Sequence, residues 1–264
     1  MNKAGKRIAT TQRKDIDWFD RNGFNDGLIA AGLHGESKVG PSGYLDKEGQ
    51  WAIRPNFADA HTFSEGLAAV LVKEGSWGFI DTSGSLVVPP QFNEAFGFHC
   101  GIAIVRKLDN TLACYSRAKD AFIFEDGKKQ VSFMGNFSDD RCRVVLKNPN
   151  SESRQKYYMG YLDVDGNMVI PAKLYDCRDF ADGVAPVRTK HNSPWKYIDK
   201  EGQTVIEDSY YDAYPFSEDR AVIVDKEGRY GCINRKGETI IQPRLAYLGE
   251  THEGMSIFTD GRRI

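Results

Sequence analysis

Gly43-Tyr44-Leu45-Asp46-Lys47-Glu48-Gly49, a short apolar run to Pro55, and then Phe63-Ser64-Glu65-Gly66-Leu67-Ala68 form the stretch that decides the fold, because its pattern recurs along most of the chain. The pattern has two anchors. The first is an aromatic-aliphatic-Asp-x-x-Gly segment, and the second is Phe-x-[Glu/Asp]-Gly. A tandem array of such units is built to present surface rather than to enclose a catalytic pocket.

Copies of both anchors fix the length of the unit at about 35 residues, since the glycines of the first anchor follow one another at spacings of 35, 43, 39, 36 and 35. That anchor begins at Tyr44, Phe79, Tyr161, Tyr197 and Cys232, and the degenerate copy Phe122-Ile123-Phe124 with Gly127 is placed in the gap. The second anchor begins at Phe24, Phe63, Phe137, Phe180 and Phe216, with weaker versions at Phe98 and Thr251. The array therefore starts in mid-unit.

Each unit is predicted to form three short β-strands. The first ends at the Asp, whose carboxylate can accept hydrogen bonds from the backbone N–H groups ahead of it, while the Gly adopts positive φ without penalty. The second is the apolar run that a Pro ends. A connecting segment then leads to the Phe-x-Glu-Gly turn and the third strand.

The third strand shows alternation when the copies are stacked. Five residues past the Phe the position is small, and seven past it is β-branched, so these two positions should share a buried face. The intervening positions accept Arg141, Arg143 and Arg220, so the other face is expected to be partly solvated.

These patterns predict an all-β chain of tandem three-stranded repeats in an open twisted array, with a closed β-propeller as the alternative. Residues 1–17 are expected to be a mobile N-terminal arm, and residues 18–264 a repeat domain of about six and a half units.

The pattern resembles the WG-repeat family (WG-containing repeat, KWG-like) of bacterial proteins over roughly residues 24–258. The Trp-Gly pair that names the family is intact only at Trp77-Gly78; elsewhere it is Ser42-Gly43, Met159-Gly160, Trp195-Lys196 and Tyr230-Gly231. The unit at about 106–158 departs most. The resemblance implies β repeats and roles in molecular interaction, and it supplies no catalytic residues.

Composition narrows the function classes. A formal net charge of −2 argues against a general nucleic-acid binder, which would carry a large basic excess. We find neither a signal peptide nor an apolar run of about 18 residues that could span a membrane. A soluble cytoplasmic protein is therefore expected, with export by a route that needs no cleaved signal left open.

Five cysteines, an odd number at wide spacing, are expected to be unpaired thiols. Alignment of the copies makes Cys142, Cys177 and Cys232 core residues, since they stand where other copies have Ala or an aromatic. Cys100 follows His99 and replaces the turn acid. A degenerate turn is the preferred interpretation there, and an exposed reactive thiol is the alternative.

No catalytic, cofactor or metal site is predicted. The chain lacks a Gly-x-Ser-x-Gly elbow, a phosphate loop and a His-Glu-x-x-His pair. The calcium-like stretch Asp163-Val164-Asp165-Gly166-Asn167 is interpreted as a hairpin turn, because sister copies place Lys beside the Asp. A hydrolytic enzyme would be favoured only if His99 and Cys100 lay in a pocket beside a carboxylate.

Three stretches interrupt the repeat, residues 106–120, 147–158 and 188–195, and they carry nine basic and three acidic residues. Equivalent loops of a stack project from one edge, and a basic edge can steer an acidic partner. The candidate partner-binding residues are Arg106, Lys107, Arg117, Lys119, Lys147, Arg154, Lys156, Tyr157, Tyr158, Arg188, Lys190 and Trp195.

The sequence therefore predicts a non-enzymatic interaction module that binds another protein with an acidic surface through this basic loop edge. Binding and modulating a toxin or an effector is one use that fits. A glycan or cell-envelope binder is the alternative, and it would be favoured by Trp51, Trp77 and Trp195 exposed together in a groove.

Overall fold

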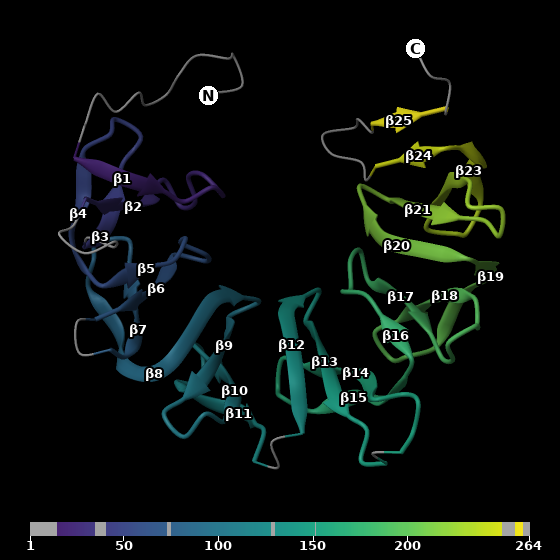
Figure 1. Cartoon of the computed structure of the whole chain (residues 1–264), viewed down its shortest axis with the longest axis horizontal. Coiled ribbons are helices and arrows are strands. Elements are labelled where there is room, and N and C mark those ends of the chain that lie inside the picture. The colour runs from purple at the N-terminus through teal and green to yellow at the C-terminus, as the bar shows by residue number, and fades with distance from the viewer. Residues whose placement is uncertain are drawn as a thin grey trace. The chain divides into compact units, whose positions relative to one another are not determined.

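The computed structural model describes residues 15–34, 41–72, 75–127, 130–150, 152–249 and 257–260 (Figure 1). The chain divides into two compact units, residues 1–127 and 128–264, which are described one at a time. Most of the predicted N-terminal arm and the weak anchor at Thr251 lie outside the described residues. Strand β1 (Ile16–Phe19) begins just inside the predicted arm.

Unit 1 contains two antiparallel sheets. The first has four strands in the order β1, β2 (Ile29–Leu33), β3 (Ser42–Leu45) and β4 (Trp51–Phe57). The second has seven, because the 14-residue strand β8 pairs with one neighbour through its first half and with another through its second half. Its strands are β5 (Asp59–Ala60), β6 (Leu67–Leu71), β7 (Trp77–Asp81), β8 (Leu86–His99), β9 (Ile102–Lys107), β10 (Leu112–Ser116) and β11 (Ala121–Glu125).

Unit 2 contains three four-stranded antiparallel sheets and a two-stranded one. The first four-stranded sheet runs β12 (Val131–Ser138), β13 (Arg141–Lys147), β14 (Tyr157–Asp163), β15 (Met168–Leu174). The second runs β16 (Asp176–Cys177), β17 (Val184–Arg188), β18 (Trp195–Asp199), β19 (Thr204–Tyr210). The third runs β20 (Asp212–Ser217), β21 (Arg220–Val224), β22 (Tyr230–Asn234), β23 (Thr239–Leu245), and β24 (Tyr247–Leu248) pairs with β25 (Phe258–Thr259).

The all-β repeat prediction is confirmed, and the repeat has one strand more than the three predicted. The fourth strand is the connecting segment, which pairs with the strand after the Phe turn, as in β16 with β17 and β20 with β21. In two repeats it is only two residues long, so it shows no alternation that a sequence pattern could reveal.

The degenerate copy is misplaced in the sequence alignment. Strand one of that repeat is β10, which pairs with β9 exactly where β7 pairs with β6, and Phe122-Ile123-Phe124 lies in the following edge strand β11. β10 reads Leu-Ala-Cys-Tyr-Ser and keeps neither the Trp-Gly pair nor the Asp, so nothing in its sequence marks it. Residues 106–120 are therefore mostly strand and hairpin rather than an inserted loop.

The predicted buried face of the third strand is confirmed, since the five small and five β-branched positions are at most 4% exposed. The other face is partly solvated, as expected, since Arg220 is exposed and Arg141 and Arg143 are half-buried. Several copies bury this face too, as Ala69, Ile104 and Val222 show, because the sheets pack on both sides. Ala68 packs with the preceding sheet, and Ala69 with the following strands.

Both predicted turns form as expected. In the Asp-x-x-Gly turn after β7, Asp81 Oδ1 accepts the N–H groups of Ser83 and Ser85 at 2.9 and 3.0 Å. In the Phe-x-[Glu/Asp]-Gly turn the acid and the residue after it both have positive φ, for example 53° at Glu65 and 76° at Gly66. Cys100 takes the acid position with φ 53°, so the degenerate-turn interpretation is confirmed.

Acids of the second turn also join successive repeats within each unit. The Glu65 carboxylate accepts the N–H groups of Cys100 and Gly101 at 2.6 and 2.8 Å, from the next turn along the chain. Asp139 accepts the N–H of Gly183 at 2.6 Å in the same way. The pair Asp26 with Gly66 repeats this contact. The recurring acid therefore has a structural role in the stacking of repeats.

Candidate binding site

The four predicted basic residues of unit 1 do not gather on one edge. Arg106 and Lys107 end β9 and form ion pairs with Glu94 at 2.9 Å and Glu125 at 2.5 Å. Arg117 and Lys119 lie in the β10–β11 hairpin, at the other end of β10. Because β9, β10 and β11 are antiparallel, the two pairs point to opposite ends of the sheet.

In unit 2 the stretch between β13 and β14 is a true loop, and its described residues, 148–150 and 152–156, make hydrogen bonds with one another. The Asn148 side-chain amide donates to the Gln155 carbonyl at 2.7 Å, and the Asn148 N–H donates to the Lys156 carbonyl at 2.8 Å. Tyr157 pairs with Lys147 across the base of the hairpin and is 46% exposed.

Its exposed cations are Lys147, Arg154 and Lys156. Tyr158 is half-buried. This hairpin therefore exposes three cations and the Tyr157 ring, and hydrogen bonds through Asn148 hold its backbone.

The equivalent loop between β17 and β18 has a different character. Lys190 is exposed, but Arg188 is half-buried and forms an ion pair with Asp176 at 3.0 Å, and Trp195 is only 4% exposed. Since Trp195 is only 4% exposed, the groove of three exposed tryptophans that would favour a glycan binder is not formed.

This loop borders a cavity of about 980 Å³ that lies wholly within unit 2. Residues 191–195 form part of its wall, residues 208–212 a second part, and residues 225–227 of the next equivalent loop a third part. Adjacent loops of the repeat therefore do meet on one side of the stack. Among the predicted partner-binding residues, Arg188 and Trp195 line it.

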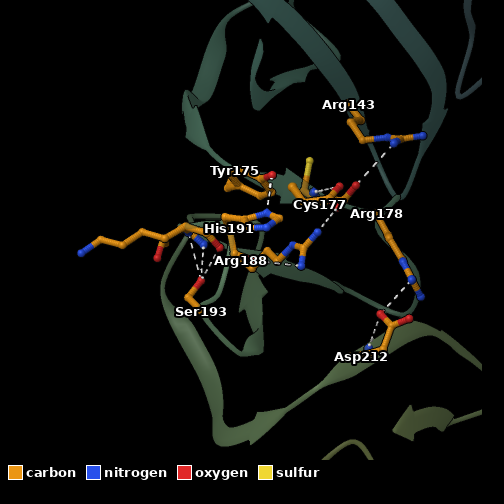
Figure 2. Close-up of polar contacts among 12 residues, drawn as sticks. Arg143, Tyr175, Cys177, Arg178, Arg188, His191, Ser193 and Asp212 are labelled. Carbon is orange, nitrogen blue, oxygen red and sulfur yellow. Dashed lines mark hydrogen bonds and ion pairs between the residues drawn. The ribbon is translucent and has the colours of Figure 1, made fainter. Parts of the chain in front are cut away.

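Two arginine–aspartate pairs lie in this cavity beside the buried indole of Trp195, and Figure 2 shows Arg178 with Asp212 and Arg188. Arg178 donates to Asp212 Oδ1 at 2.8 Å, and Arg188 donates to Asp176 Oδ2 at 3.0 Å. Both guanidinium groups lie over the Trp195 ring, with centroid distances of 4.9 and 5.1 Å. Cation–π contact and ion pairing together hold both arginines in place.

The loop itself is fixed by polar contacts that Figure 2 also shows. The Tyr175 hydroxyl lies 2.6 Å from His191 Nδ1, and Arg188 donates to the His191 carbonyl at 3.3 Å. Ser193 accepts the N–H groups of Thr189 and Lys190 at 3.2 and 3.0 Å. The wall formed by residues 191–195 is therefore pre-organised.

Buried polar atoms without a hydrogen-bond partner concentrate here. Among the described residues four such side-chain atoms occur, and three of them, Arg178 Nη1, Arg188 Nε and Tyr210 Oη, belong to residues that line the cavity. Burial, followed by the nearby Asp208 carboxylate, raises the pKa of Tyr210 to about 12. Its hydroxyl is therefore protonated at neutral pH and available as a donor.

The sequence missed most of the cavity. In three repeats the glycine of the Trp-Gly position faces a Pro; a Cβ on Gly78, for example, would lie 2.9 Å from Pro90 N. Both members are replaced in the repeat of β18 and β19, by Lys196 and Asp208, but also in the repeat of β10 and β11, by Ala113 and Glu125. The double replacement is therefore not specific to the repeat that borders the cavity.

A smaller cavity of about 460 Å³ in unit 1 holds His61, His99 and Asp20. Cys100 does not line this cavity. Cys100 is exposed, and its backbone N–H donates a hydrogen bond to the Glu65 carboxylate. The arrangement that would favour an enzyme, His99 and Cys100 in one pocket beside a carboxylate, is therefore only partly present.

The remaining cysteines are core residues, as predicted for three of them. None of these residues forms a disulfide, and each is at most 4% exposed: Cys114, Cys142, Cys177 and Cys232. Burial raises the pKa of Cys114 and of Cys177 to about 12, so both are thiols rather than thiolates at neutral pH.

The calcium-like stretch is a hairpin turn in which Asp163 Oδ1 accepts the N–H groups of Asp165 and Asn167 at 3.0 and 2.8 Å. Within the described residues no three His, Cys, Asp or Glu side chains converge as a metal site requires. The described part of the chain also has no helix of the length and apolarity needed to cross a membrane.

Comparison with protein families gives one match. The model of the WG containing repeat matches five times, at residues 43–75, 77–110, 159–190, 195–229 and 230–261. No curated protein is similar enough in sequence to count as a match.

Among solved structures, one similar chain is described as the eukaryotic initiation factor (12% identity, 88% of this chain and 67% of that chain, TM-score 0.52). The computationally designed Ika8 protein (14%, 93% and 81%, 0.49) and the WD40 beta propeller domain of Doa1 (11%, 89% and 86%, 0.36) are also similar. At these identities the likeness concerns the fold alone, and the last two scores are too low to assign a closed propeller.

Proposed function

Because the chain belongs to the WG containing repeat family, whose repeats here present ordered loops, we propose that it is a non-enzymatic interaction module that binds another protein with an acidic surface. The observation that carries this proposal is the β13–β14 hairpin, which exposes Lys147, Arg154 and Lys156 together with the ring of Tyr157.

Pre-organisation makes this hairpin suitable for binding. Its hydrogen bonds through Asn148 already fix the loop, so less conformational entropy is lost when a partner binds. Exposed lysines and arginine raise the association rate with an acidic surface, and a central tyrosine supplies apolar contact area. Lys190 of the neighbouring equivalent loop adds a further exposed cation.

The other predicted cations contribute less to this proposal. Arg106, Lys107 and Arg188 form ion pairs with Glu94, Glu125 and Asp176. These pairs must be broken before the three side chains can bind elsewhere. We therefore place the partner surface in unit 2, on the β13–β14 hairpin with Lys190. A toxin or an effector whose activity the module modulates is one class of partner that such a surface would serve.

The test is charge reversal at three positions. K147E/R154E/K156E should abolish retention of a partner captured from native lysate by the wild-type chain. Its affinity for the purified partner should fall at least about a hundredfold at low salt, and the difference should shrink as salt rises. K173E/K236E/R244E is a matched control, because these residues are also exposed in unit 2 and its change in charge is the same.

Equal binding by the wild type and the hairpin variant would remove the hairpin from the proposal. Equal loss in both triple variants would mean that binding depends on net charge alone, and the proposed surface would then be rejected.

A further inference from the structure

We propose that the 980 Å³ cavity of unit 2 is a binding site for a short neutral carbohydrate, separate from the protein-binding hairpin. The size of the cavity, its mixed charges, its buried polar atoms without partners and the exposed ring of Tyr211 support this assignment.

The charge pattern disfavours an ion of either sign. Five carboxylates and three permanent cations line the cavity together: Asp176, Asp208, Asp212, Asp225 and Glu227 with Arg178, Arg188 and Lys226. The two arginines already have aspartate partners, so they hold little free charge for an anion. Four of the carboxylates also have arginine partners, since Arg229 pairs with Asp225 and Glu227, so little free charge is left for a cation.

A hydroxyl group fits a wall of mixed carboxylates and cations because it both donates and accepts a hydrogen bond. Side by side, a carboxylate accepts from one sugar hydroxyl while a guanidinium or phenol donates to the next. Asp208 and Tyr210 offer such an acceptor–donor pair on one wall.

The buried atoms without partners indicate that the wall is polar beyond what the protein itself satisfies. Arg178 Nη1 and Arg188 Nε are buried and have no hydrogen-bond partner among the described residues. Tyr210 is 8% exposed, and the Asp208 carboxylate beside its hydroxyl is the nearest group that could accept from it. Buried polar groups in proteins nearly always find a partner, and water or ligand oxygen supplies it where protein does not.

A flat apolar surface is also present. Tyr211, which lines the cavity, is 69% exposed, and Pro194 and Pro243 line the same cavity. The C–H face of a pyranose ring packs against such surfaces. A volume of this size lies at the upper end for small-ligand sites and accommodates about two to four sugar residues.

The departures of this repeat from the others create the cavity. The inserted loop supplies the wall of residues 191–195, and Asp208 stands where four repeats have Pro or Ala and the repeat of β10 and β11 has Glu125. At this position Asp208 lines the cavity.

The test uses the full chain on an array of neutral oligosaccharides of two to four residues, followed by calorimetric titration with the strongest binder. Y211A and D208N should each weaken binding at least about tenfold. Y247A and E201Q, on exposed residues of unit 2 outside the cavity, should bind as the wild type does. Thermal unfolding checks that each variant is folded.

Absence of binding to every neutral oligosaccharide would overturn the proposal, and so would binding that neither variant weakens. Competition by a basic or an acidic peptide for the same residues would assign the cavity to a protein ligand instead. K147E/R154E/K156E should leave sugar binding unchanged, so this inference and the proposed protein surface can fail separately.

Discussion

At the scale of single residues, the aromatic position of the first anchor combines core packing with one hydrogen bond. Tyr44, Tyr161 and Tyr197 are buried, and each donates its hydroxyl to a backbone carbonyl 17 residues later, at 2.8, 2.6 and 2.7 Å. Phe79 and Cys232 stand at the same position without a hydroxyl, so the hydrogen bond is an addition in the copies that have it.

Removing one of these hydroxyls should destabilise the chain measurably. Y197F leaves the Tyr214 carbonyl without its partner in a buried place, which costs about 1–2 kcal/mol. Urea unfolding followed by fluorescence measures the change. Y211F, at a side chain 69% exposed, is the control and should change stability by less than about 0.5 kcal/mol. Equal effects of the two variants would contradict the assigned role of the hydroxyl.

The turn acids make a pH-dependent contribution. The Ser83 hydroxyl, followed by the backbone N–H of Ser85, donates to Asp81 and lowers the pKa of its carboxyl. Because the folded-state pKa is lowered, the contribution is present above the unfolded-state value and is lost as pH falls through the folded-state value. Asn234 makes the same backbone contacts in its own turn without a charge.

D81N should therefore fold, and its deficit in melting temperature relative to the wild type should be largest at neutral pH. The deficit should shrink below about pH 4, where Asp81 becomes protonated in the unfolded and then in the folded chain. Melting curves between pH 7 and pH 3 test this. A deficit that stays constant over this range would show that the charge of Asp81 does not contribute.

At the scale of elements, the sequence predicts what local chemistry determines. The two turns depend on Asp, Glu and Gly at fixed positions, and the strands beside them follow the alternation of buried residues. Strands β16 and β10 were not predicted, because β16 has only two residues and β10 keeps no anchor of the repeat. The cavity escaped because its walls come from three segments, residues 191–195, 208–212 and 225–227, that only the stacking of repeats brings together.

In four repeats the Trp-Gly glycine packs closely against the backbone of the paired strand, whereas Ala113 and Lys196 replace it in the other two. A Cβ on Gly160 would lie 2.5 Å from the Ile170 carbonyl oxygen and 2.7 Å from the Ala172 nitrogen, which are backbone atoms that cannot move aside without disrupting β15. G160A should therefore destabilise unit 2 by about 2–4 kcal/mol, as overpacking at buried positions does.

Denaturant titration checks this, and G127A is the control, because a Cβ there would meet nothing within 4 Å. A loss in G160A no larger than in G127A would show that β14 and β15 can separate at little cost.

At the scale of the whole molecule, hydrogen bonds from turn acids join successive repeats within each unit. The turn acids join successive repeats in unit 1 through Asp26 and Glu65, and in unit 2 through Asp139 and Asp182. Cys100 has no carboxylate to offer, so the series in unit 1 ends at its turn. In repeat proteins, stability is close to a sum of terms within repeats and between neighbours.

Each described sheet lies entirely within one unit, so every backbone pairing of unit 2 is available to residues 128–264 alone. Three four-stranded sheets with buried clusters between them meet the need for about three stacked repeats. Residues 128–264 expressed alone should therefore give a β-type circular dichroism spectrum and a cooperative melting transition. D139A should lower that transition, because the Gly183 N–H loses its carboxylate partner, at a cost of about 1–3 kcal/mol. A fragment that stays unfolded would show that unit 2 depends on residues 1–127 for its stability.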